Sequence, residues 1–510
     1  MNKDLIIQLQ QQRLSEQQKL IALLRGLDAE QKKLIIGLQQ LNTEQQKLIV
    51  GLQNANESQA KTILLFEARL GEIENIQKKN SSNSSKPPSS DMARPKRTQS
   101  LRTKSDKKPG GQDGHSGETL SFSATPDDVI SHVVSHCSCC GKNLSSVAAS
   151  ELERRQVYDA PPIKIMVTEH QSELKHCPKC NTANKAAFPE GVAHPVQYGP
   201  GVQTWAVYLT QFQLLPYSRT AQLFRDLFGH SVSEAFLVNN NRRFAKVLQP
   251  FICNLKDKLL QQPVLHADET GYYYNGQRNW LHTLCTEGHT LYMPHAKRGT
   301  EAMDEMGVLT EFKNTLVHDF WKPYNEYACK HALCNVHHLR DFTFCEEVLE
   351  CSWAGSAKQF LISLLKKVNK AKESGVDSLT PSQLKYIRKK YKQLIEKGQN
   401  LYPPPEKVKG RRGAVKKSKS HNLLERFVRY KEEVLGFANN FSIPFGNNLA
   451  EQAIRMMKIK QKVSGCFRSE QGAKDFATIR SYIATMQKQG YETFQAIQCA
   501  IRGVPMKLLA

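Results

Sequence analysis

The sequence predicts an α+β protein of several domains, in which a mixed sheet with a helical insertion follows an N-terminal coiled coil and a small β-rich lobe. Three features predict this organisation: a repeat near the N-terminus, two cysteine pairs, and a run of short strands that alternate with turns. A chain of 510 residues also exceeds the size of one ordinary hydrophobic core. We therefore expect several domains, and each is justified in order below.

The charge balance points to a polyanionic partner. The chain carries 71 basic and 48 acidic residues, a formal net charge of +23. Such an excess favours nucleic acid first and an anionic membrane surface second. The N-terminus has no secretory signal pattern, and we find no run of eighteen apolar residues, so no membrane span is expected. Thirteen cysteines without such a signal suggest a reducing compartment and a cytoplasmic protein.

The segment 1–79 has the pattern of a coiled coil. Residues 16–21 return as 30–35 and again as 44–49, a period of two heptads. The d positions are Leu20, Leu27, Leu34, Leu41 and Leu48, and the a positions are Leu24, Gln31, Leu38, Gln45 and Leu52. An apolar seam of period 3.5 predicts a left-handed coiled coil and a homo-oligomer. The alternative is a single amphipathic helix lying on the globular body.

The segment 80–118 is a polar tract followed by a basic one. Between residues 86 and 108 stand eight basic residues and two acidic ones. This composition cannot bury a core, so it predicts a flexible basic linker that tracks phosphates without reading sequence. Lys96 and Arg97 are candidate DNA-binding residues here. The alternative is a tail that only improves solubility.

Two cysteine pairs lie in the segment 119–193, which we expect to be a small β-rich lobe. Cys137 and Cys140 form one Cys-x-x-Cys pair, and Cys177 and Cys180 form the other. Four thiolates with this spacing predict a structural Zn²⁺ site, because a closed set of four leaves no open position for a reacting water. His136 or Cys139 could replace a ligand at the first pair. The alternative is a set of free buried cysteines.

The segment 194–258 shows helical spacing. Apolar residues flank Gly229 in a pattern that resembles a helix–turn–helix, and Ser231 or Ser233 could cap the second helix. An ordinary helical hairpin fits the same pattern.

The segment 259–342 predicts most of a mixed sheet. A strand over 264–268 ends at Asp268, and Asn275-Gly276 marks a hairpin turn. Strands at 280–285 and 290–293, a helix over 300–311 and a strand over 315–319 follow, the last ending at Asp319. The crossover helix should lay this strand parallel to the first. Three antiparallel strands, a helix and a further strand make the opening half of a ribonuclease-H-like sheet.

A helical, Lys-rich insertion is expected over 343–436, with a basic loop that contains Arg411 and Arg412. The segment 437–490 then returns to the core with Glu451 on a helix that capping asparagines begin. Arg455 and Lys458 follow Glu451 on the same helix face, suited to phosphate contacts. The alternative is an exposed face with an ion pair between Glu451 and Arg455. Residues 491–510 are expected to be a C-terminal tail.

The acidic residues at the two strand ends suggest divalent metal. Magnesium prefers hard oxygen ligands, and two ions about 3.5–4 Å apart can serve phosphodiester attack. Asp268 and Asp319 are well placed if their strands are neighbours, and Glu451 could close the site from the side. A second group of metal-ligand types matches no ligand spacing, so packing or phosphate contacts are expected for it. Its members are Cys329, His331, Cys334, His337 and His338.

Several motifs together resemble the insertion sequence 66 family of transposases. The acids stand in blocks like its three catalytic blocks: His-Ala-Asp-Glu-Thr at 266–270, His-Asp at 318–319 and Asn-Asn-Leu-Ala-Glu-Gln-Ala-Ile-Arg at 447–455. Residues 110–115, Gly-Gly-Gln-Asp-Gly-His, resemble another of its elements, and the similarity spans roughly 80 to 490. Gln452 departs from the family, which often has arginine there.

The resemblance implies an acid triad of Asp268, Asp319 and Glu451 that binds Mg²⁺ or Mn²⁺, a zinc-finger-like module and a helical insertion. It implies a bacterial, nucleoid-associated transposase that cuts and joins double-stranded DNA at insertion-sequence ends and target. Accessory proteins encoded by the same element are expected partners. Three alternatives remain: a non-catalytic DNA-binding regulator derived from a transposase, a structure-selective nuclease of the same fold, and an oligomeric scaffold.

Overall fold

The computed structural model describes residues 3–80, 83, 120–160, 163–403 and 417–509. The chain divides between residues 95 and 96 into two compact units. Four of the predicted DNA-binding residues lie outside the described residues, as do nearly all of the predicted linker and the element at 110–115. These four residues are Lys96, Arg97, Arg411 and Arg412.

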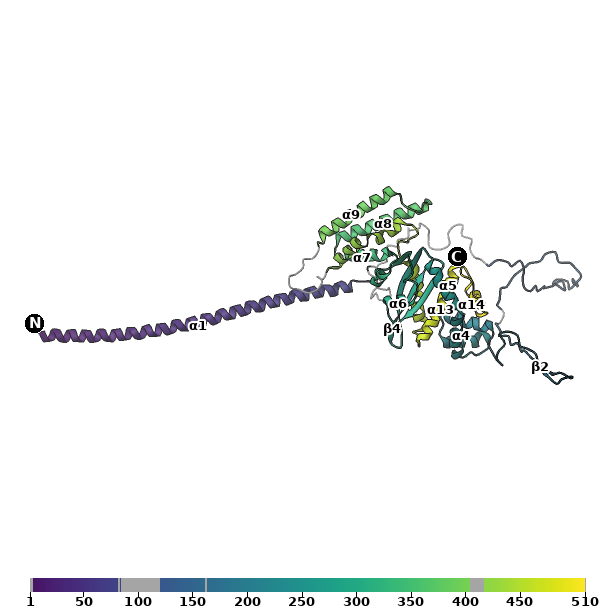
Figure 1. Ribbon diagram of the computed structural model, residues 1–510, viewed down its shortest axis with the longest axis horizontal. Helices are drawn as coiled ribbons and strands as arrows, with labels where there is room; N and C mark the ends of the chain where they lie inside the picture. The colour runs from purple at the N-terminus through teal and green to yellow at the C-terminus, as the bar shows by residue number, and fades with distance from the viewer. Residues whose placement is uncertain (1–2, 81–82, 84–119, 161–162, 404–416, 510) are drawn as a thin grey trace. The chain divides into compact units, whose positions relative to one another are not determined.

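The first unit contains one continuous helix, α1 (Lys3–Gln77), of 75 residues (Figure 1). None of its described side chains is buried. Leu20 and Leu34, two of the predicted d positions, are 58% and 68% exposed. A helix this long whose described apolar stripe is exposed is consistent with a coiled coil.

The cysteine-rich segment contains little regular structure. Strands β1 (Leu174–His176) and β2 (Ala183–Lys185) pair antiparallel around the second cysteine pair. An isolated antiparallel bridge between His136 and Asn143 brackets the first pair in the same way.

Four helices and one π-helical turn lead into the sheet. They are α2 (Pro200–Val207), the π-helical turn Tyr208–Phe212, α3 (Tyr217–Phe228), α4 (Glu234–Val247) and α5 (Gln249–Leu260). Gly229 ends α3 with a φ of 63°, and Ser233 caps α4 by accepting a hydrogen bond from the amide of Phe236. Two helices joined at Gly229 are therefore present, with Ser233 as the cap of the second, and this arrangement fits both a helix–turn–helix and an ordinary helical hairpin. Use of α4 in a DNA groove stays a prediction.

Five strands form the central mixed sheet in the order β5-β4-β3-β6-β7. Strands β3, β4 and β5 are antiparallel, while β6 runs parallel to β3 and β7 parallel to β6. The bounds are β3 (Val264–Tyr274), β4 (Gln277–Cys285), β5 (Thr290–His295), β6 (Thr315–His318) and β7 (Lys330–Leu333). The predicted turn at Asn275 and Gly276 and the parallel pairing of β6 with β3 are confirmed. Strand β7 was not predicted.

Short helices connect the later strands, and four more form the insertion. The connections are α6 (Thr300–Glu305) and a 3₁₀ turn (Lys322–Glu326), and α7 (Asn335–Glu347) follows β7. The insertion consists of α8 (Ser352–Glu373), α9 (Pro381–Leu401), α10 (Lys419–Arg429) and α11 (Lys431–Asn439). Trp353 and Phe427 are fully buried in a core that the insertion shares with α7, so these helices carry their own apolar cluster.

Three helices complete the chain: α12 (Asn448–Ser464), α13 (Glu470–Lys488) and α14 (Thr493–Ile501). Helix α13 runs along the β5 edge, where the amides of Thr290 and Tyr292 donate to the hydroxyls of Thr485 and Ser481. These bonds satisfy donors that an edge strand would otherwise leave open. The predicted tail therefore contains a helix, α14, and Ile497 of this helix is fully buried.

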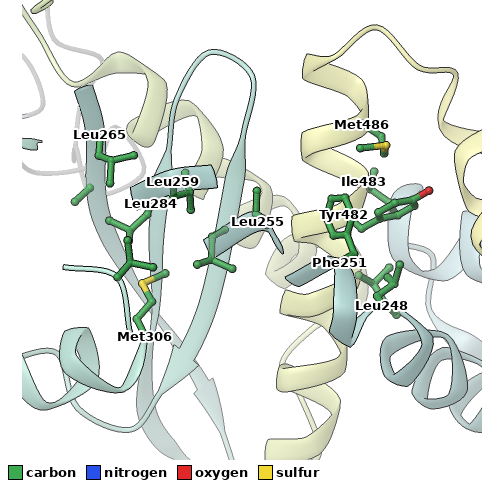
Figure 2. Close-up of a cluster of buried hydrophobic side chains, with 14 of the residues drawn as sticks. Leu248, Phe251, Leu255, Leu259, Leu265, Leu284, Met306, Tyr482, Ile483 and Met486 are labelled. Atoms are coloured by element: carbon green, nitrogen blue, oxygen red, sulfur yellow. The ribbon is translucent and has the colours of Figure 1, made fainter. Parts of the chain in front are cut away.

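The main core lies between the sheet and the helices α5 and α13. Figure 2 shows Tyr482, Ile483 and Met486 of α13 with Leu248 and Phe251. The rings of Phe251 and Tyr482 meet edge to face with their centroids 4.9 Å apart. From the sheet, Leu265 and Leu284 join the same cluster. This packing fixes β3, the central strand, from which the site is built. Among the described residues, no helix is both long and apolar enough to span a membrane.

Candidate active site

Asp268 and Asp319 lie on the same face of the sheet. The register pairs His266 of β3 with Val317 of β6. Asp268 and Asp319 each stand two residues further along, and side chains two residues apart in a strand share a face. The two aspartates therefore come near one another, and the charge of Asp319 contributes to the raised pKa of Asp268. Asp319 directly follows β6, as predicted, whereas the prediction that the first strand ends at Asp268 is wrong, because β3 continues through Asp268 to Tyr274.

Glu451 stands in the first turn of α12, and its charge contributes to the raised pKa of Asp268. The side chain of Asn447, which is 1% exposed, anchors the start of that helix. Its Nδ2 donates to the carbonyl of Ala267 at 2.7 Å, and its Oδ1 lies 2.8 Å from Nδ1 of His266. Since these partners flank Asp268 in β3, the anchor ties Glu451 to the strand that carries the first aspartate.

The charges of the other two acids act on Asp268. The pKa of Asp268 is raised well above its ordinary value, first by burial and then by the charges of Glu269, Asp319 and Glu451. Asp268 Oδ1 accepts a hydrogen bond from the Glu269 amide at 2.8 Å. A buried carboxyl group that resists ionisation beside other carboxylates is a setting in which a divalent cation is favourable. Carboxylates are the ligand type that magnesium takes, and binding of this ion by the three acids stays a prediction.

Glu269 is a further buried acid that the sequence did not single out. It lies one residue beyond Asp268 and so faces the opposite side of the sheet. Its side chain is 0% exposed, pairs with the guanidinium of Arg298 at 2.6 Å and accepts from the hydroxyl of Tyr324 at 2.6 Å. Arg298 in turn lies over the ring of Trp321, 3.8 Å from its centroid. These contacts give each carboxylate oxygen of Glu269 a partner within the chain.

The chain after β6 is held by the same group of residues. Asp319 Oδ1 accepts from the backbone amide of Trp321 at 2.9 Å. His318 precedes it, and burial, together with the charge of His331, lowers the pKa of His318 to about 3. A neutral, buried His318 that hydrogen-bonds to His331 at 3.1 Å is a structural residue, and Asp319 is the one that faces the site.

A mixed group of metal-ligand types lies beside Glu451. Ligand atoms of Cys334, His337 and Glu451 all lie within 4.8 Å of one another, the one such group within the part of the chain that the structure describes. From the sequence, packing or phosphate contacts are predicted for Cys334 and His337. Their Cys-x-x-His spacing across the start of α7 is the signal that could have found them.

The predicted phosphate-binding residues of α12 differ in their surroundings. Arg455 is exposed. Lys458 donates from Nζ to the carbonyl of Gly271 at 2.7 Å, and partial burial followed by the charge of Arg278 lowers its pKa. Arg455 is thus open to a phosphate, while Lys458 also fastens α12 to β3.

The two cysteine pairs form two similar turns. The amides of Gly141 and Asn181 donate back to the carbonyls of Cys137 and Cys177, at 3.0 and 2.8 Å, and both residues have positive φ. The backbone of Cys140 and Cys139 lowers the pKa of Cys137, and Thr182 lowers that of Cys180. Depressed thiol pKa values favour the thiolate that a metal needs. Among the described residues, no three of these cysteines lie within 4.8 Å of one another, so a shared four-thiolate site stays a prediction.

Comparison with models of protein families identifies the family of this chain. The model of the family described as "Transposase IS66 family" matches residues 195–475, more than half of the chain. The chain belongs to the IS66 family of transposases. The "zinc-finger binding domain of transposase IS66" matches residues 135–181, and a family of unknown function matches residues 8–121. A comparison with curated proteins found no match.

The matched ranges contain the residues considered above. The IS66 transposase match includes all three acids and the anchor Asn447, and the zinc-finger match includes both cysteine turns. The family resemblance drawn from the sequence is therefore confirmed for this IS66 transposase chain. The zinc-finger match, together with the paired cysteines, indicates that the chain binds Zn²⁺. Membership of the transposase family indicates that its partner is DNA.

Proposed function

We propose that this chain cuts double-stranded DNA at the ends of its insertion sequence and joins the freed ends to a target. Asp268, Asp319 and Glu451 would hold Mg²⁺ or Mn²⁺. The observation that supports this is the placement of two aspartates on one sheet face with the glutamate of α12 beside them. The sheet order, three antiparallel strands with two further strands parallel to the first, supports a ribonuclease-H-like core.

The described geometry suits a site that shares its ligands between two ions. The three acids do not form a group within 4.8 Å among the described residues. Two ions about 3.5–4 Å apart spread their ligands more widely than one ion does. When bound, such ions activate an attacking oxygen and stabilise the leaving oxygen.

The chain's own residues orient and screen this site. Asn447 sets the distance between α12 and β3, and the ion pair of Glu269 with Arg298 keeps the neighbouring acid out of the metal-binding set. Arg455 is placed to clamp a phosphate one turn after Glu451. Four thiolates of the cysteine turns would hold a structural Zn²⁺, and α1 would assemble a homo-oligomer through its exposed leucines.

The test is cleavage of a duplex that carries the element's own end, by the purified full-length chain with Mg²⁺. We expect Asp268→Asn to reduce cleavage at least a thousandfold, because it removes a metal ligand and its charge. Asp257→Asn, which changes an exposed side chain of α5, should leave cleavage unchanged. Equal cleavage by Asp268→Asn would remove this residue from the mechanism. Cleavage without joining would show a nuclease, and binding without cleavage a regulator.

A further inference from the structure

Cys334, His337 and Glu451 form a cluster that the proposed magnesium chemistry does not use as a whole. A sulfur, an imidazole nitrogen and a carboxylate oxygen lie within 4.8 Å of one another. Cys334 is 2% exposed, and the side chains of His337 and Glu451 are 21% and 20% exposed. The cluster is thus partly open on one side and closed at the sulfur.

Two helix starts build this cluster. Cys334 is the N-cap of α7 and His337 stands three residues later, so both side chains lie on one side of the first turn. Glu451 occupies the first turn of α12. The backbone amide of Asn447 donates to Sγ of Cys334 at 3.2 Å, which fastens the two helix starts together. The positions of all three side chains are therefore set by the fold.

Two polar atoms of the cluster have no hydrogen-bond partner. Nδ1 of His337 and Oε1 of Glu451 are buried and make no hydrogen bond of ordinary geometry with the described residues. His337 does interact with its neighbours: burial opposes its charged form, but the Cys334 side chain and the charge of Glu451 outweigh it and raise the pKa of His337 to about 9. Nε2 of His337 lies 3.9 Å from Oε1 of Glu451, too far for a hydrogen bond. Buried polar atoms are normally satisfied, so unpaired atoms in a convergent donor set indicate a missing ligand.

The donor types select the kind of ion. Magnesium takes oxygen ligands in octahedral geometry and does not seek a thiolate. Zinc takes sulfur, nitrogen and oxygen together, and three protein ligands leave a fourth position open. A backbone amide that donates to the sulfur, as Asn447 does here, is a typical support for a metal-bound thiolate.

We propose that Cys334, His337 and Glu451 form a second, zinc-binding site, separate from the cysteine turns and sharing Glu451 with the magnesium site. An oxygen from water or from a phosphate completes it. Because one carboxylate serves both sites, zinc withdraws Glu451 from magnesium. This last consequence rests on the proposed function, whereas the binding of zinc does not.

The test is the zinc content of the full-length chain after exposure to Zn²⁺ and removal of loosely bound metal, measured by native mass spectrometry. We expect the unaltered chain to hold two zinc ions, one at the cysteine turns and one here. Cys334→Ser, His337→Asn and Glu451→Gln should each lose one. Cys253→Ser, which removes an exposed thiol on α5, should keep both. Two ions in all three site variants would overturn the proposal.

X-ray absorption on the unaltered zinc-loaded chain tests the proposal without any variant that could misfold. We expect imidazole scattering and fewer than four sulfur ligands per zinc, on average; four sulfurs with no imidazole would overturn it. Zinc should also slow magnesium-dependent cleavage, by a larger factor in the unaltered chain than in Cys334→Ser. Zinc content is measured without DNA, so failure of cleavage would contradict only the proposed function.

Discussion

Asn447 couples the strand of the first aspartate to the helix of the glutamate, and its removal is the sharpest perturbation of the fold around the site. Asn447→Ala deletes two buried contacts, to the Ala267 carbonyl and to Nδ1 of His266. Burial lowers the pKa of His266, so a neutral ring would be left unpaired. Each buried polar group left without a partner costs about 1–3 kcal/mol.

We expect Asn447→Ala to lower the free energy of unfolding by about 3 kcal/mol, about a hundredfold in the unfolding equilibrium. Urea denaturation followed by tryptophan fluorescence measures it, because all four tryptophans lie outside α1. Asn448→Ala is the matched control. That side chain is exposed at the next position, and its loss should cost about 0.5 kcal/mol or less. A loss below about 1 kcal/mol in Asn447→Ala would refute the anchoring role.

Three further predictions concern the ion pair, pH and assembly. Arg298→Ala leaves Glu269 buried without its counter-charge, keeping only the hydrogen bond from Tyr324, and should lower the free energy of unfolding in urea by about 3–5 kcal/mol. Adding Glu269→Gln should recover part of this loss. Burial lowers the pKa of His282 to about 4, so the unfolded chain takes up a proton first as pH falls below about 6.5. The free energy of unfolding should therefore fall by about 3 kcal/mol between pH 6.5 and 4, and His282→Gln should lack this part of the pH dependence. Thermal melting at several pH values measures both. Leu34→Lys at a d position should dissociate the oligomer in sedimentation, whereas Gln39→Lys should not; equal effects would contradict the heptad register.

The zinc-binding and magnesium-binding proposals share one side chain, which makes Glu451 the most informative position. Glu451→Gln should lose both cleavage and one zinc ion, whereas Asp268→Asn should lose cleavage alone. The two variants therefore separate the two metals. If both variants kept two zinc ions, Cys334 and His337 would not bind metal with Glu451.

The sequence by itself determined the features that depend on local pattern. Heptad spacing predicted a long helix, and α1 is one; Asn275-Gly276 predicted the hairpin between β3 and β4, and both residues have positive φ. The acid after β6 was predicted because strand alternation and turn residues are local signals, whereas the first strand was predicted too short and continues past Asp268. The motifs that resemble the family's catalytic blocks then linked these acids to Glu451, which lies far along the chain.

Only the tertiary structure decided the features that join distant segments. Strand β7 is four residues long and carries no clear alternation, so its pairing with β6 comes from burial in the sheet. The capture of Glu269 by Arg298 and the meeting of Cys334 with Glu451 require contacts between residues 29 and more than a hundred positions apart. No periodicity encodes such contacts, because they are fixed by how the helices pack on the sheet.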